Sequence, residues 1–98
     1  MKTAWVTFNA INMESAASLE KLLHELAQNS KDEQGMVRYE VFRAQDNVLS
    51  YYVRESWEDE AAMQQHLAQP HLARFSAAAN KLLKAPFALE KIETLLSF

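Results

Sequence analysis

Two imidazoles, a carboxylate and an indole lie close together in the second half of the chain. The segment YYVRESWEDEAAMQQHLAQPHLARF contains Glu55, Trp57, His66 and His71, and so holds two of the three histidines. Imidazole exchanges protons near neutral pH, and a nearby carboxylate can orient its ring. Gathered around one cleft between a sheet and helices, these side chains would form a small-molecule pocket with acid–base groups.

Glu55 is the least expected of these residues, because strand alternation places it on an apolar face. The side chains on that face of the predicted strand are Leu49, Tyr51, Val53, Glu55 and Trp57. A carboxylate among apolar neighbours must find hydrogen-bond donors or take up a proton. His66, at the edge of the next helix's apolar stripe, and His71, which begins the following helix, are its nearest candidate partners.

Each residue also has a purely structural interpretation. Glu55 can accept hydrogen bonds from backbone amides or from His66, which can itself be a hydrogen-bonded core residue. Trp57 can simply pack in the core, and His71 can cap its helix. His24 lies opposite the apolar stripe of its helix, so we expect it to face solvent. A metal site of His66, His71 and Glu55 is disfavoured, because the histidines fall in different helices without a His-x-x-x-His pattern, and we expect no metal.

The composition excludes several classes of function. The chain has 98 residues, with 10 basic and 13 acidic side chains and a net charge of −3, and its basic residues form no cluster dense enough for nucleic acid. It has no cysteine, which excludes disulfides, a thiolate nucleophile and cysteine-bound metal. No segment approaches the roughly 18 apolar residues of a membrane span. We expect a soluble, cytoplasmic protein with a single domain over residues 1–98.

Alternation and helical spacing predict seven elements in the order β-α-β-β-α-α-β. Strands are expected over residues 3–11, 36–43, 48–57 and 87–98. One helix is expected over residues 13–31, a second from a cap at Ser56 or Asp59 to about residue 68, and a third from Pro70 to just before Pro86. This order predicts an α+β, ferredoxin-like fold with one antiparallel sheet and its helices on one face. By parity the other face carries Trp5, Met36, Phe42, Tyr52, Leu89 and Leu95. Such an apolar surface is costly in water, so we expect a homodimer through the sheets.

The segment from Glu55 to Phe75 resembles the antibiotic biosynthesis monooxygenase domain family. In that family a Glu-x-Trp ends a strand and is followed by a helix, a His and a Pro-His-x-x-x-aromatic. The segment from Glu33 to Tyr39, E-Q-G-x-x-x-Y, is similar to the family's loop into its second strand, although Gln34 stands where members usually have Pro. The resemblance implies a dimeric α+β barrel and, in some members, oxygenation of quinol-like or polycyclic aromatic substrates without a cofactor.

The motif and the strand parity together predict roles for seven residues. We expect His66 to act as base or proton relay and Glu55 to fix its tautomer. Trp57 and Phe75 would wall the cavity, His71 would be a second polar anchor, and Tyr39 and Tyr51 would face the same space. The expected partners are a small-molecule substrate and O₂. Alternatives are an isomerase with the same acid–base pair, a non-catalytic ligand-binding dimer, and a haem-binding member that uses Asn29 and His71.

Overall fold

A computed structural model describes all 98 residues and contains the seven predicted elements in the predicted order. The elements are β1 (Lys2–Asn9), α1 (Met13–Ser30), β2 (Met36–Arg43), β3 (Ser50–Trp57), α2 (Glu60–Leu67), α3 (Pro70–Asn80) and β4 (Ala88–Ile92). None of the helices combines the length and apolar character that crossing a membrane requires.

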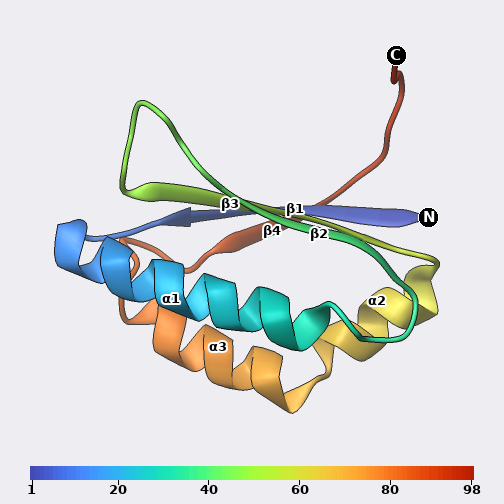
Figure 1. Cartoon of the computed structure of the whole chain (residues 1–98), viewed down its shortest axis with the longest axis horizontal. Coiled ribbons are helices and arrows are strands. Elements are labelled where there is room, and N and C mark those ends of the chain that lie inside the picture. Colours follow the sequence, from blue (N-terminus) through green and yellow to red (C-terminus); the bar gives the residue numbers. More distant parts are fainter.

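The strands form one antiparallel sheet in the order β2-β3-β1-β4. All three helices cover the same face of this sheet, so the molecule has two layers (Figure 1). The predicted α+β, ferredoxin-like fold is therefore confirmed. The chain beyond β4 runs away from the helical layer, towards the side of the sheet that no helix covers (Figure 1).

Local signals set the starts of the three helices. The side chain of Asn12 accepts a 2.8 Å hydrogen bond from the Ser15 amide at the start of α1. Asp59 caps α2 in the same way, through a 2.9 Å bond from the amide of Ala62. Pro70 opens α3, where its missing N–H removes no helical hydrogen bond.

The last helix and the last strand are both shorter than predicted. Beyond Asn80 the backbone pairs with the end of β1: Leu82 C=O accepts from the Ile11 amide at 3.0 Å, and the Lys84 amide donates to Asn9 C=O at 2.9 Å. This pairing replaces the helical bonds that residues 81–85 would otherwise make. The final strand then covers only Ala88–Ile92 beside β1, and not residues 87–98.

The main core lies between the helices and the inner face of the sheet. Its largest buried members include Phe8, Leu19, Leu23, Val53 and Phe75. A second, smaller cluster near the start of α2 is formed by Ala4, Trp57, Ala62 and Met63. The site described below lies where these two clusters adjoin.

The outer face of the sheet carries only part of the predicted apolar set. Trp5 stacks on Tyr52 and Phe42, with ring centroids 5.4 and 6.1 Å apart, as parity predicted. Met36 is wrongly placed by parity, because an irregularity between Met36 and Arg38 shifts the register and the side chain packs against the smaller core cluster. The predicted position of Leu89 is also wrong, since Leu89 pairs with the buried Val6 and lines a cavity on the helical side of the sheet.

Leu95 lies beyond the end of β4, so it belongs to no face of the sheet. Its side chain is exposed, as are those of Leu96 and Phe98. The parity argument failed here because it assumed that the last strand continues to the end of the chain.

Candidate active site

A small cavity of about 40 Å³ lies between the inner face of the sheet and the helices. Its lining is almost entirely apolar and consists of Val6, Phe8, Leu26, Tyr39, Val53, Glu55, His66, Leu67, Leu72, Phe75, Phe87 and Leu89. Tyr39, Glu55 and His66 are the only lining residues with polar side chains. An apolar cavity with a few convergent polar groups is the usual form of a small-molecule site.

Glu55 lies on the inner face of β3, as strand parity predicted, and is only 3% exposed. Trp57, two residues along the strand, donates a hydrogen bond from Nε1 to Glu55 Oε1 at 3.2 Å. Burial raises the pKa of the Glu55 carboxyl, and the neighbouring His66 and the bond from Trp57 oppose this effect. Glu55 is thus a carboxyl group adapted to exchange a proton nearer neutral pH.

His66 lies in the last turn of α2 and points towards the sheet. Its Nε2 atom is 3.7 Å from Glu55 Oε1, and its ring stacks on Trp57 with centroids 4.5 Å apart. Its Nδ1 atom lies 2.9 Å from Oε2 of Glu33, in the loop between α1 and β2. A carboxylate can only accept, so Nδ1 carries the proton in the neutral ring and the Nε2 lone pair faces Glu55.

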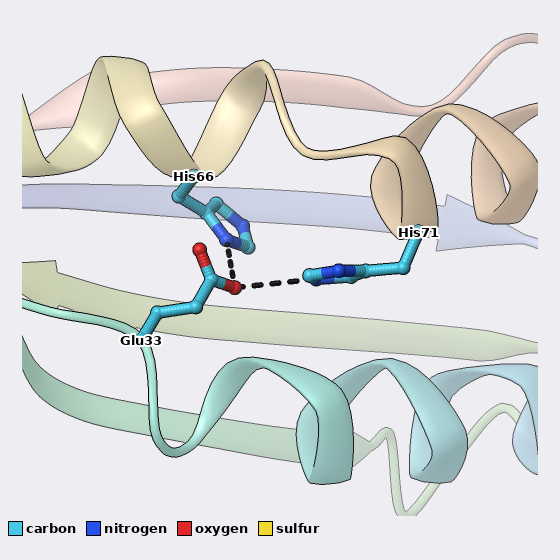
Figure 2. A group of neighbouring side chains, drawn as sticks. All are labelled: Glu33, His66 and His71. Carbon is cyan, nitrogen blue, oxygen red and sulfur yellow. Dashed lines mark hydrogen bonds and ion pairs between the residues drawn. The ribbon is translucent and has the colours of Figure 1, made fainter.

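His71 stands beside this pair but outside the cavity. Its Nε2 atom is 3.2 Å from Glu33 Oε2, so the Glu33 carboxylate lies between two imidazoles (Figure 2). The His71 Nε2 atom is nevertheless buried without a hydrogen-bond partner. The predicted polar anchor is therefore near the acid–base pair, but it faces Glu33 and not the cavity.

Tyr39, on β2, brings a phenol to the same cavity. Its ring meets the His66 ring edge-on, with centroids 6.1 Å apart. Burial raises the pKa of the Tyr39 phenol far above its usual value, and the carboxyls of Glu55 and Glu33 add to the increase. The hydroxyl therefore stays protonated and is available as a hydrogen-bond donor.

The family model for antibiotic biosynthesis monooxygenase matches residues 3–78, well over half of the chain. The chain belongs to this family. A relative in Bacillus subtilis, YcnE, which is named as a candidate monooxygenase, is 36% identical over 68 residues, or 69% of this chain and 72% of that protein.

Two solved structures of similar proteins cover nearly the whole chain. A candidate antibiotic biosynthesis monooxygenase from Deinococcus radiodurans has a TM-score of 0.90 at 26% identity, over 100% of this chain and 96% of its own. SnoaB of Streptomyces nogalater, described as a cofactor-independent oxygenase, has a TM-score of 0.84 at 22% identity, over 98% of this chain and 95% of its own. The likeness to SnoaB concerns the fold.

The remaining predicted site residues of this family member divide into two groups. Phe75 lines the cavity, and its ring meets the Phe8 ring edge-on with centroids 5.9 Å apart. Trp57 is completely buried behind the His66 ring, and Tyr51 lies in the main core, where its hydroxyl donates a 3.4 Å bond to Ala16 C=O. Trp57 and Tyr51 therefore do not line the cavity, and Trp57 reaches the site through Glu55 and His66.

Glu33 is the site residue that sequence reasoning missed. Its loop is held against the segment between β3 and α2 by Gly35, which has φ +82° and whose carbonyl oxygen accepts a 2.8 Å hydrogen bond from the Glu58 amide. The segment E-Q-G-x-x-x-Y carries a signal, because it is similar to the family's loop, but the resemblance by itself indicates only a connection between two elements. The position of Glu33, two residues before the only glycine, is typical of a loop with a fixed shape.

Proposed function

We propose that this protein is a cofactor-independent monooxygenase that acts on quinol-like or polycyclic aromatic phenols. The observation that supports it best is the buried pair of Glu55 and His66 at the polar end of an otherwise apolar cavity. An electron-rich phenol would place its rings against the apolar lining and its hydroxyl against His66. Family membership supports the reaction type, and the substrate class is our proposal.

In this reaction His66 Nε2 takes the proton of the substrate hydroxyl. The resulting imidazolium is flanked by Glu33 at Nδ1 and Glu55 at Nε2, so two carboxylates stabilise the charge that forms. The Tyr39 hydroxyl donates a hydrogen bond to negative charge that develops on substrate or oxygen. A substrate seated against the apolar lining would displace water, which would strengthen each of these interactions.

The substrate anion transfers one electron to O₂, and the two radicals combine to form a carbon–oxygen bond. The peroxide takes back the proton held by His66. Loss of the remaining hydrogen from the oxygenated carbon then breaks the O–O bond, so that one oxygen atom becomes a new carbonyl on a former CH₂ or ring CH carbon and the other leaves as water. The substrate supplies all four electrons in this sequence. The residues described above only move the proton and hold the charge.

The substrate must widen the cavity, because about 40 Å³ is much less than the several hundred Å³ of a typical ligand site. Leu67, Leu72 and Phe87 line the cavity and are only partly buried. Rotation of these three side chains would widen the cavity while leaving Glu55 and His66 in place.

We further propose that two copies associate through the outer faces of their sheets. Trp5, Phe42 and Tyr52 form a stacked aromatic patch on a face that no helix covers. Phe42 is 37% exposed in the isolated chain. Burial of such a patch against its own copy would stabilise a symmetric dimer.

Oxygen uptake by the chelator-treated protein tests the proposed function. The substrates are hydroquinones and naphthols, and products formed under isotopically labelled O₂ are analysed by mass spectrometry. We expect enzyme-dependent incorporation of label, which is lost in His66→Gln and kept in His24→Gln, whose side chain is exposed on α1. Turnover that continues under nitrogen would identify an isomerase, and uptake at the spontaneous rate would refute the monooxygenase proposal.

A further inference from the structure

Three potential metal ligands converge from three separate segments beside the cavity. Glu33 comes from the loop after α1, His66 from the last turn of α2 and His71 from the first turn of α3 (Figure 2). One ligand atom from each residue lies within 4.8 Å of the other two. The two histidines are in different helices, and the break at Pro70 turns α3 so that both rings reach the same carboxylate.

The distances from Glu33 to the two histidine nitrogens are close to those of a first coordination shell. Glu33 Oε2 lies 2.9 Å from His66 Nδ1 and 3.2 Å from His71 Nε2. Ligand atoms bound to one zinc ion at about 2.0–2.1 Å stand roughly 3.4 Å apart in a tetrahedral arrangement. The three ligand atoms lie within 4.8 Å of one another, so the two histidine side chains would rotate to bring their nitrogens closer around an ion.

A second observation is the unpartnered state of His71. Its Nε2 atom is buried and makes no hydrogen bond, despite its proximity to Glu33. Buried polar atoms nearly always have a partner, and one without a partner requires an explanation. A bound cation would satisfy this nitrogen and would also neutralise Glu33, whose ion pairs are made with the two histidines alone.

Glu55 and Trp57 lie where residues that support a metal-bound His66 would be needed. When Nδ1 of a histidine binds a metal, the other ring nitrogen carries the proton and commonly donates it to a carboxylate. His66 Nε2 faces Glu55 at 3.7 Å, and Trp57 in turn donates to that carboxylate. At 3.7 Å the two groups are not yet hydrogen-bonded, and a small approach of Glu55 to Nε2 would complete the arrangement of metal ligand, imidazole and outer carboxylate.

We propose that Glu33, His66 and His71 form a binding site for a divalent transition-metal ion such as Zn²⁺. Two imidazoles and one carboxylate, with a position left for water, are a donor set that suits zinc and its neighbours better than Mg²⁺ or Ca²⁺. The side chains of Glu33 and His71 are 13% and 15% exposed, so a metal ion would enter past them. His66 lies beneath them, with a side chain that is 1% exposed.

Metal binding would switch off the base, a consequence that rests on the proposed function. An ion on Nδ1 fixes the ring proton on Nε2, where it points at Glu55. The lone pair that would accept the substrate proton is then no longer available. The same histidine can thus serve as base in the free protein or as ligand in the metal-bound protein, but not as both at once.

Calorimetric titration of the chelator-treated protein with ZnCl₂ tests the site directly. We expect one ion per chain, with binding largely lost in His71→Ala and in Glu33→Gln. Glu55→Gln, which alters only the outer shell, is expected to bind roughly 10- to 100-fold more weakly. The matched control is His24→Ala, which removes an exposed histidine and should bind as the wild type does.

Circular dichroism establishes that each variant is folded, and the visible absorption of bound Co²⁺ reports the coordination geometry independently. Wild-type binding no tighter than that of His71→Ala and Glu33→Gln would overturn the proposal, as would loss of binding in His24→Ala. If quinol oxidation is observed, zinc should inhibit it with a concentration dependence that weakens in His71→Ala in parallel with binding. If no oxidation is observed, the proposed function fails, and the calorimetry still decides the metal site.

Discussion

Oε2 of Glu33 lies 2.9 Å from Nδ1 of His66, although the two residues are 33 positions apart in the sequence. The contact joins the loop after α1 to the last turn of α2 and fixes the tautomer that leaves Nε2 free. It also places a negative charge beside the imidazolium that forms when His66 accepts a proton. Glu33 thus acts on the proposed reaction through His66 and is a positioning residue.

Replacement of Glu33 should therefore lower turnover in the metal-free protein. Glu33→Gln keeps a hydrogen-bond acceptor but removes the charge, whereas Glu33→Ala removes both, so the loss of kcat should be larger for Ala. Removal of the base itself in His66→Gln should cost about 10²–10⁴-fold. The measurement is the initial rate of quinol oxidation, with Asp32→Asn, an exposed carboxylate in the same loop, as the control. Equal rates for wild type and both Glu33 variants would contradict the role.

The sequence predicted Glu55 and missed Glu33 for a physical reason. Glu55 lies in a regular strand, where alternation of side chains is a local property and parity gives the face directly. The contact of Glu33 depends on where a loop of fixed shape meets a helix far along the chain, and no periodicity encodes it. Parity failed at Met36 in turn, because a single irregularity in β2 moves a side chain to the other face.

The angles between the helices could not be predicted from the sequence either. Helical spacing correctly predicted that α2 and α3 pack on the sheet and that His66 faces it. Spacing says nothing of the angle between the two helices, and that angle directs His71 towards Glu33 and away from the cavity. Pairing of residues 82–84 with the end of β1 likewise shortened α3, because a tertiary contact replaced helical bonds.

The buried carboxyl of Glu55 should make stability depend on pH. Burial raises its pKa above the ordinary value of 4.5, so the folded protein binds more protons than the unfolded chain between these two values. Stability is then lost as pH rises from 4.5 through the folded-state pKa, by about 1.4 kcal/mol for each unit of the increase. Glu55→Gln, which keeps an acceptor for Trp57, should remove this loss.

Urea denaturation at a series of pH values measures the effect. The stability of Glu55→Gln relative to wild type should increase from acidic to neutral pH. Glu60→Gln is a control whose pH dependence should have the opposite sign. Hydrogen bonds from Gln64 and Lys91 lower the pKa of the exposed Glu60 carboxyl, so its contribution to stability is lost as pH falls. A difference between Glu55→Gln and wild type that stays constant with pH would show that Glu55 ionises as it would in water.

Tyr39 should remain a neutral phenol in alkaline solution. Burial raises its pKa above the ordinary value of 10.0, and the nearby carboxyls of Glu55 and Glu33 reinforce this effect. The sign is that of a group whose folded-state pKa is raised: stability is complete below pH 10.0 and falls as pH increases beyond it. An ultraviolet titration of phenolate should therefore give the same curve for wild type and Tyr39→Phe until the fold is lost. An extra phenolate in the folded wild type would contradict the prediction.

The proposed dimer makes a prediction for the outer face of the sheet. A charge at Phe42, in the stacked patch with Trp5, would have to be buried at the interface, so Phe42→Glu should convert the dimer into a monomer. Sedimentation equilibrium distinguishes the 11.2 kDa chain from its dimer. Val48→Glu is the matched control, because Val48 is a similarly exposed apolar side chain in the loop between β2 and β3. A monomeric wild type, or a dimer that survives Phe42→Glu, would refute this interface.

Gly35 provides a test of how the Glu33 loop is held in place. Its φ of +82° is unfavourable for other residues, and an added Cβ would lie 2.5 Å from the Cβ of Ala62 on α2. Gly35→Ala should therefore destabilise the fold by roughly 1–2 kcal/mol for the backbone alone, with a further cost for the overlap. The contact with Ala62 can be separated from the backbone effect, because Ala62→Gly removes the atom that the added methyl group would meet.

A double-mutant cycle in urea makes that separation. The double variant should be less destabilised than the sum of the two single variants, since the overlap is present only in the Gly35→Ala single variant. The backbone cost should remain in both proteins that carry the Gly35→Ala change. Additive effects would mean that the loop moves away from α2 to accommodate the methyl group. In that case Glu33 should lose its contact with His66, and turnover should fall as it does in Glu33→Ala.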